Sequence, residues 1–195
     1  RELNVGYISR MERGRPWVRC KLAMSLDGRT ALSSGESKWI TGESARGDVQ
    51  RLRARSCAIV TGVGTIEHDN PSMNVRHDQM AVDFNHYAYP IPPLRVILDS
   101  RLRALPQMKL LTHPGEVLIA TTAADHSVSK WRDVPSVTVV QTRSSAAGVD
   151  PDAVIAMLSS RAINEVLIEA GACLSASFLK AGLIDELWVY GAPKL

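Results

Sequence analysis

Short apolar runs that alternate with helix-like segments constrain the fold of this chain more than any other feature. Seven runs are rich in β-branched residues and have glycine, proline or other breakers nearby: residues 17–24, 56–62, 94–100, 116–122, 136–141, 164–170 and 185–191. Three segments between them repeat apolar residues with the period of an amphipathic helix: residues 43–55, 151–162 and 172–181. Strands alternating with helices predict an α/β fold with a largely parallel central sheet flanked by helices.

The size and composition fit one well-buried domain. The chain has 195 residues, of which 45% are hydrophobic and 22% charged, so disorder and low complexity are excluded. A net charge of +3 does not indicate nucleic-acid binding. No signal peptide and no apolar run near the length of a membrane span is present, which predicts a cytoplasmic protein without a membrane partner. Residues 1–16 read as a lead-in or linker, and residues 68–93 as a long loop with four prolines and three histidines.

The sequence lacks the motifs of several common kinds of catalytic, metal and nucleotide site. The three cysteines have no C-x-x-C spacing, so neither a disulfide framework nor a zinc site is predicted; Cys20 and Cys57, within apolar runs, are expected to be buried thiols. The five histidines have no ligand-like pairing, and we expect no metal site. A nucleophile elbow, H-E-x-x-H and a P-loop are absent. The dinucleotide fingerprint is incomplete: Gly62-x-Gly64 follows a strand, but Glu67 stands at the third glycine position, so a plain glycine turn is the alternative interpretation.

Two apolar strands deliver polar residues at their carboxyl ends, where open α/β sheets bind ligands. The run 94–100 ends in Asp99 and Ser100, with two arginines following; a hydroxyl beside arginines suits a phosphate monoester, and a solvated loop is the alternative. The run 164–170 contains Glu169 and leads through Gly171 into a helix, whose free amides attract phosphate. A helix-capping role is the alternative for Glu169.

Basic and aromatic side chains offer further candidates. Lys21 shares a mixed strand face with Trp17, Arg19 and Ala23, and Arg53 and Arg76 are candidate anion ligands; solvated positions are the alternative for all three cations. Ser37 and Trp39 are two residues apart, so an extended backbone would point both at one pocket. The alternative for Trp39 is a core plug beside the helix 43–55.

Taken together, four blocks in order resemble the reductase domain of the bifunctional riboflavin-biosynthesis deaminase–reductase. They are "KLAMSLDGRTALSSGESKWIT", "RLRARSCAIVTGVGTIEHDNPSMNVR", "RVILDS" and "VLIEAGACLSASFLKAGLIDELWVYGAPKL". The resemblance implies a dihydrofolate-reductase-like fold and NADPH-dependent reduction of 5-amino-6-(5-phosphoribosylamino)uracil to the ribitylamino product. It also implies that residues 1–16 link to a preceding deaminase domain, and that zinc would bind only in that domain. Residues 17–195 would then form the reductase domain, with an incomplete C-terminal end.

The resemblance also implies roles for individual residues. Positions expected to contact NADP are Ala23, Trp39, Thr65, Asp69, Ser100 and the phosphate-wrapping segment Gly171, Ala172, Cys173, Leu174, Ser175, Ala176 and Ser177. Positions expected to contact the phosphorylated pyrimidine substrate are Ser37, Arg53, Met73, Arg76 and Glu169. Lys21 matches a lysine near the reacting sugar and is the catalytic or positioning candidate.

The chain departs from the family pattern at two pairs of residues. Met73-Asn74 stands where the family often has Leu-Thr, and Ala172-Cys173 replaces a glycine-proline type of pair, so altered packing is expected there. Two alternatives stay open: another reductase of this fold acting on a heterocycle, and a non-catalytic nucleotide-binding or dimerisation module. The apolar strand 185–191 would be an exposed edge, which predicts a homodimer or higher homo-oligomer.

Overall fold

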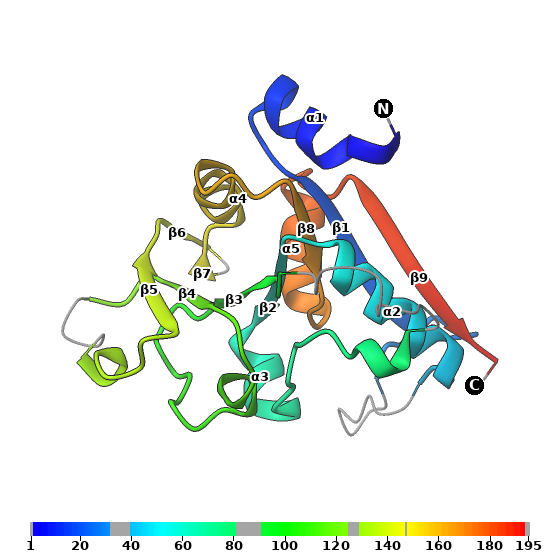
Figure 1. Ribbon diagram of the computed structural model, residues 1–195, viewed down its shortest axis with the longest axis horizontal. Coiled ribbons are helices and arrows are strands. Elements are labelled where there is room, and N and C mark those ends of the chain that lie inside the picture. Colours follow the sequence, from blue (N-terminus) through cyan, green and yellow to red (C-terminus); the bar gives the residue numbers. More distant parts are fainter. Residues whose placement is uncertain (1, 32–39, 81–90, 125–128, 147, 194–195) are drawn as a thin grey trace.

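One sheet of seven parallel strands forms the centre of the molecule (Figure 1). The computed structural model describes residues 2–31, 40–80, 91–124, 129–146 and 148–193. The strand order is β5-β4-β3-β2-β8-β1-β9, and every pairing in this sheet is parallel. The strands are β1 Trp17–Ser25, β2 Ala58–Gly62, β3 Leu94–Leu98, β4 Val117–Thr121, β5 Val137–Gln141, β8 Glu165–Ile168 and β9 Glu186–Ala192. The predicted α/β fold with a largely parallel sheet is therefore confirmed.

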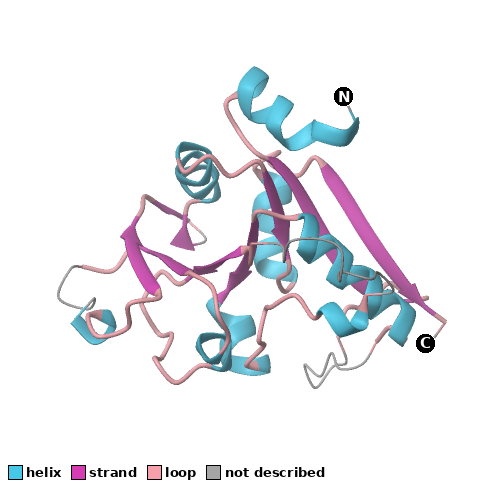
Figure 2. Cartoon of the chain, in the orientation of Figure 1, coloured by secondary structure: helices cyan, strands magenta, loops and turns pink. Residues whose placement is uncertain are grey.

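Helices lie on both sides of the strands (Figure 2). The α-helices are α1 Val5–Arg13, α2 Glu43–Arg55, α3 Val63–Asp69, α4 Pro151–Ser160 and α5 Ala172–Lys180. Short 3₁₀ turns are η1 Glu2–Asn4, η2 His77–Gln79 and η3 Lys109–Thr112, and the two-residue strands β6 Ser144–Ser145 and β7 Gly148–Val149 form an antiparallel hairpin. None of the described helices is long and apolar enough to span a bilayer.

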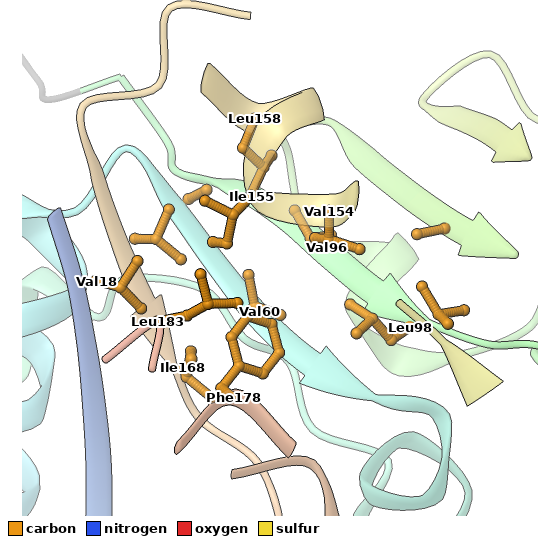
Figure 3. Close-up of a cluster of buried hydrophobic side chains, with 14 of the residues drawn as sticks. Val18, Val60, Val96, Leu98, Val154, Ile155, Leu158, Ile168, Phe178 and Leu183 are labelled. Carbon is orange, nitrogen blue, oxygen red and sulfur yellow. The ribbon is translucent and has the colours of Figure 1, made fainter. Parts of the chain in front are cut away.

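Each face of the sheet buries its own hydrophobic core. On one face, strand residues such as Val18, Val60 and Val96 pack against Leu158 of α4 and Phe178 of α5 (Figure 3). On the other face, Ile59 and Ile97 pack against Ile66 of α3, with Leu110 and Trp131 closing the layer. Apolar residues on both faces explain why the central strands read as continuous hydrophobic runs.

A buried arginine joins three strands near their amino ends. Arg19 on β1 is only 2% exposed, and its guanidinium forms ion pairs with Glu165 of β8 and with Glu186 of β9, the latter at 2.5 Å between Nε and Oε2. Because a buried charge needs partners, these two carboxylates allow the arginine to stay inside. The amino edge of the sheet is thus held by ion pairs.

Three local expectations need correction or refinement. The alternative interpretation of Gly62-x-Gly64 as a plain glycine turn is wrong, because α3 begins at Val63 directly after β2. Residues 5–13 of the lead-in form the helix α1. Cys20 is buried as predicted, whereas Cys57 is half-buried, and all three cysteines are free thiols.

Candidate active site

The carboxyl ends of the parallel strands gather most of the predicted site residues at one edge of the sheet. Lys21 and Ala23 lie on the carboxyl half of β1, and Ser100 and Glu169 closely follow β3 and β8. The helices α3 and α5 begin directly after β2 and shortly after β8. Ser37 and Trp39 lie outside the described residues.

A buried ion pair between Arg53 of α2 and Glu169 occupies the middle of this edge. Arg53 Nε donates to Glu169 Oε1 at 2.6 Å, and Arg53 Nη2 donates to Glu169 Oε2 at 2.9 Å. Both side chains are 12% exposed. Arg53 Nη1 also donates to the carbonyl oxygen of Asn74 at 2.9 Å. This two-point contact fixes the orientation of the carboxylate more firmly than a lysine would.

Two cations determine the ionisation of Glu169. Burial by itself raises the pKa of the Glu169 carboxyl, but the Arg53 guanidinium, with its hydrogen bonds, and the Lys21 ammonium outweigh burial, so the pKa lies below its usual value. Lys21 is level with Glu169 in the sheet, because Cys20 is paired with Ile168 one residue earlier. The site therefore holds a carboxylate that is ionised at neutral pH, with a lysine beside it.

The two predicted anion-binding arginines differ in their surroundings. Arg53 is engaged by Glu169, so it orients this carboxylate. The guanidinium of Arg76 has no hydrogen bond or ion pair with another described residue, and Gln50 Oε1 fixes its backbone by accepting from Arg76 N at 3.0 Å. Of these two arginines, Arg76 therefore stays the candidate for binding an external anion.

The side chain of Met73, which was expected to contact substrate, is buried in the core. It is 3% exposed and packs into the core beside α3, with a φ of 50° that non-glycine residues rarely adopt. The side chain of Met73 is thus mostly taken up by core packing, and the substrate contact expected for this residue stays a prediction.

Among the polar residues that follow β3, two are engaged by other parts of the protein. Asp99 is fully buried, and its Oδ2 accepts from Ala104 N at 2.7 Å, so this carboxylate holds a turn. Arg103 is paired with Glu67 at 2.8 Å. Ser100 is half-buried beneath the β6–β7 hairpin: a Cβ added at Gly148 would lie 3.4 Å from its hydroxyl oxygen.

The starts of α3 and α5, the two helices with expected cofactor positions, lie close together. Thr65 and Asp69 are four residues apart on α3 and share one face of it. Leu174 approaches the start of α3, since its Cδ2 would lie 3.4 Å from a Cβ at Gly62. Gly171 borders open space, because no described residue other than its chain neighbours has an atom within 4 Å of a Cβ built there.

The serines of α5 are already engaged with its backbone. Ser175 is buried and its hydroxyl donates to the carbonyl oxygen of Ala170 at 3.4 Å. Ser177 donates to the carbonyl oxygen of Cys173 at 3.0 Å. The exposed part of the expected phosphate-wrapping segment is thus its beginning, residues 171–173.

A tyrosine–aspartate pair that sequence reasoning missed closes the far side of the site. Tyr190 on β9 is paired with Ala23 of β1, and its hydroxyl donates to Asp48 Oδ2 of α2 at 2.7 Å. Burial raises the pKa of the Tyr190 phenol, and the carboxylates of Asp48 and Glu169 raise it further. The alternation of β9 was the available signal, because Trp188 and Tyr190 fall on the face that carries Lys21.

Known proteins share this architecture and sequence. A family model described as the RibD C-terminal domain matches residues 16–195. The chain is 41% identical over 198 residues to the riboflavin biosynthesis protein RibD of Haemophilus influenzae, covering 100% of this chain and 51% of that protein. It is similar to the solved structure of Acinetobacter baumannii RibD, with 41% identity and a TM-score of 0.82 over 100% of this chain and 51% of the other.

A further solved structure has a name that states two activities. It is a Thermotoga maritima protein named diaminohydroxyphosphoribosylaminopyrimidine deaminase/5-amino-6-(5-phosphoribosylamino)uracil reductase, with 25% identity and a TM-score of 0.75 over 97% of this chain and 48% of that one. The chain spans about half the length of the curated relatives it matches. The expected dihydrofolate-reductase-like fold is confirmed by the parallel sheet and by its similarity to RibD structures. With the family model matching nearly every residue, the chain belongs to the RibD C-terminal domain family.

Proposed function

We propose that this chain is the reductase half of a riboflavin-biosynthesis protein and reduces 5-amino-6-(5-phosphoribosylamino)uracil with NADPH in the cytoplasm. The observation that carries the proposal is the buried Arg53–Glu169 pair level with Lys21, at the sheet edge where parallel α/β folds bind ligands. Family membership and the reductase named for the Thermotoga maritima protein support the same activity. We further propose, from the same relatives, that residues 1–16 connect this domain to a preceding deaminase domain.

The residues present fit a dinucleotide at the starts of α3 and α5. Among the described residues Gly171 opens onto free space and, as the N-cap of α5, has no side chain to cap the first amides of the helix, which can bind phosphate oxygens. Thr65 and Asp69 offer polar groups from α3, and Ser100 with Arg101 suits the 2′-phosphate that distinguishes NADPH from NADH. When bound, the cofactor supplies a hydride.

The substrate groups have matching partners in this site. The guanidinium of Arg76 has no ion pair with another described residue and can bind the sugar phosphate. Glu169, ionised and oriented by Arg53, accepts hydrogen bonds from sugar hydroxyls or from base N–H groups. Arg53 thus acts as a positioning residue.

Lys21 has a chemical role in opening the sugar. The bond between C1′ and the ring oxygen must break before C1′ can accept a hydride, while the nitrogen lone pair forms a C=N bond. We assign the Lys21 ammonium to protonate the departing ring oxygen, with Glu169 holding the ammonium nearby. The nitrogen recovers its electron pair when the hydride reaches C1′, so the overall reaction takes up one hydride and one proton.

The decisive experiment measures NADPH oxidation by the full-length protein with the phosphoribosylaminouracil. Lys21→Ala should lower the single-turnover rate by roughly a hundredfold or more, with NADPH affinity little changed. The exposed Lys109→Ala is the matched control. A wild-type rate in Lys21→Ala would remove its catalytic role.

Two other results would redirect the assignment. NADPH binding without oxidation would favour the non-catalytic module. Equal turnover of an unphosphorylated heterocycle would favour another reductase of this fold, because the free Arg76 would then have no phosphate to bind.

We also propose that the domain self-associates through its β9 side. Among the described strands β9 is the last of the sheet, and Leu187 and Val189 on it are 53% and 43% exposed. Exposed apolar residues on an open edge favour pairing between copies. Light scattering of the wild type and of Leu187→Lys/Val189→Lys should show a larger mass for the wild type.

A further inference from the structure

Lys21 lies on β1, the strand between β8 and β9, so it has a neighbour on each side. On the β8 side, Glu169 is level with Lys21. On the β9 side, Lys21 is paired with Trp188, and Tyr190 lies two residues further along on the same face. Diagonal neighbours on one face of a sheet are about 7–8 Å apart, which long and aromatic side chains can bridge. The long side chain of Lys21 can therefore reach polar groups on both sides.

The helix α2 fixes the polar side chain on each side of Lys21. Arg53 of α2 donates two hydrogen bonds to Glu169, of 2.6 and 2.9 Å. Asp48, which lies earlier on the same helix, accepts a hydrogen bond from the Tyr190 hydroxyl at 2.7 Å. Figure 1 shows α2 in front of β1. The Glu169 carboxylate and the Tyr190 hydroxyl are therefore both oriented by α2, with the strand that carries Lys21 between them.

The oxygen of Tyr190 can take part in a further hydrogen bond only as an acceptor. A phenol has a single O–H, and Tyr190 donates this proton to Asp48. Burial raises the pKa of the Tyr190 phenol, and the carboxylates of Asp48 and Glu169 raise it further, so the phenol keeps its proton at neutral pH. A suitable donor on the neighbouring strand is the Lys21 ammonium, because an ammonium has three N–H groups and no acceptor.

We propose that Tyr190, oriented by Asp48, is a positioning residue that accepts a hydrogen bond from the Lys21 ammonium. Glu169 accepts from a second of the three N–H groups, and the third points at the ring oxygen that departs from C1′ of the sugar. This inference rests on the proposed function, in which Lys21 protonates that oxygen.

Two fixed acceptors restrict the position of a lysine ammonium more than one acceptor does. The ammonium stands at the end of a flexible chain of carbon atoms and can adopt many positions around a single carboxylate. A second acceptor on the other side of β1 limits Lys21 to positions between Glu169 and Tyr190. Because a displacement of about 1 Å can slow a reaction by about a hundredfold, Tyr190 contributes to turnover without touching the substrate.

Single-turnover oxidation of NADPH by the full-length protein, at saturating substrate, distinguishes this role from a hydrogen bond that only holds β9 to α2. Tyr190→Phe should be about tenfold slower than the wild type, with unchanged NADPH affinity. Tyr7→Phe removes the same hydroxyl at a tyrosine that is 52% exposed and is the matched control. In Lys21→Ala, which lacks the ammonium, adding Tyr190→Phe should have no further effect. A wild-type rate in Tyr190→Phe, or a double variant slowed by the product of the two single effects, would overturn the proposal.

The part played by Asp48 is tested by two substitutions of similar size. Asp48→Asn keeps an oxygen that accepts from the Tyr190 hydroxyl, whereas Asp48→Leu removes it. Asp48→Asn should therefore retain most of the single-turnover rate that Asp48→Leu loses. Equal rates in these two variants would mean that Asp48 does not orient Tyr190.

The order of the Lys21 side chain can be measured without turnover. Nuclear magnetic relaxation of isotopically labelled lysine ammonium groups gives an order parameter for each lysine, and Lys21→Arg identifies the Lys21 signal. Lys21 should be more ordered than the exposed Lys109, and Tyr190→Phe should lower its order parameter toward that of Lys109. An unchanged value in Tyr190→Phe would overturn the proposal. Absence of turnover in the wild type would instead refute the proposed function, while the relaxation data still decide whether Tyr190 holds Lys21.

Discussion

Arg53 and Glu169 depend on each other, because either charge alone would be left buried without its partner. Arg53→Met leaves the Glu169 carboxylate unpaired and should lower the free energy of unfolding by about 3 kcal/mol. Urea denaturation at neutral pH measures this loss. Arg53→Met/Glu169→Leu should recover most of it, because both charges are then absent. An unchanged unfolding midpoint in Arg53→Met would show that the pair does not hold α2 to the sheet.

Arg76 permits a test of phosphate recognition that is separate from the fold. Its guanidinium has no ion pair within the described ranges, so Arg76→Ala should leave stability nearly unchanged. A lost charge-assisted hydrogen bond predicts a KM for the phosphorylated substrate that is roughly 10- to 100-fold higher, with a smaller effect on kcat. Steady-state kinetics provide the measurement, with the exposed Arg161→Ala as control. Equal KM values in the two variants would exclude Arg76 from the phosphate site.

The sequence predicted which strand ends carry polar side chains, but it could not show which of these side chains pair with one another. The position of Glu169 at the end of a parallel strand predicts a ligand-binding edge, and Lys21 is a candidate from its mixed strand face and from the family resemblance. The contact between Arg53 and Glu169 joins residues 116 positions apart, and no local pattern contains it. Arg53 was consequently expected to bind an anion, whereas the structure places it on a carboxylate of its own chain.

At the scale of elements, the Tyr190–Asp48 hydrogen bond ties the edge strand β9 to α2. Tyr190→Phe removes this bond and should cost about 1 kcal/mol of stability. The amides of β9 should then exchange with deuterium faster, measured against Tyr7→Phe as control. Since folding raises the pKa of Tyr190, its contribution is present below about pH 10 and is lost as pH rises further. Tyr190→Phe should not show this loss of stability at high pH. If the variant had the same exchange rates and the same loss of stability at high pH as the wild type, the hydrogen bond would not hold β9 to α2.

Helices and strands long enough to show a repeating apolar pattern were predicted from the sequence, whereas short ones were not. The helix expected at residues 43–55 has those bounds in the structure, because Val49 and Leu52 mark its buried side. α3 was missed since Gly62 and Gly64 favour a turn locally, while packing of Ile66 against the sheet selects a helix. The β6–β7 hairpin has two residues in each strand, too few to show alternation.

For the whole molecule, Glu169 should contribute to the loss of stability in acid. Its pKa is lower in the folded state than its usual value, so its contribution is present at neutral pH and is lost as pH falls through the folded pKa, below about pH 4. The wild type should exceed Glu169→Gln in melting temperature at pH 7, and the difference should shrink on acidification. Thermal melts across this pH range measure it. A difference that is independent of pH would mean that ionisation of Glu169 does not stabilise the fold.

The strand order also determines when each strand can pair during synthesis on the ribosome. β1 is made before every other strand of this sheet, yet its two partners are β8 and β9, which begin at residues 165 and 186. At about 5–20 residues per second, β1 waits roughly 7–30 seconds before its first partner is translated. During this interval an apolar strand emerges with no neighbour to pair with, which makes it a natural substrate for chaperones. Strands β2 to β5 pair in chain order, so this half of the sheet can assemble while the nascent chain is still growing.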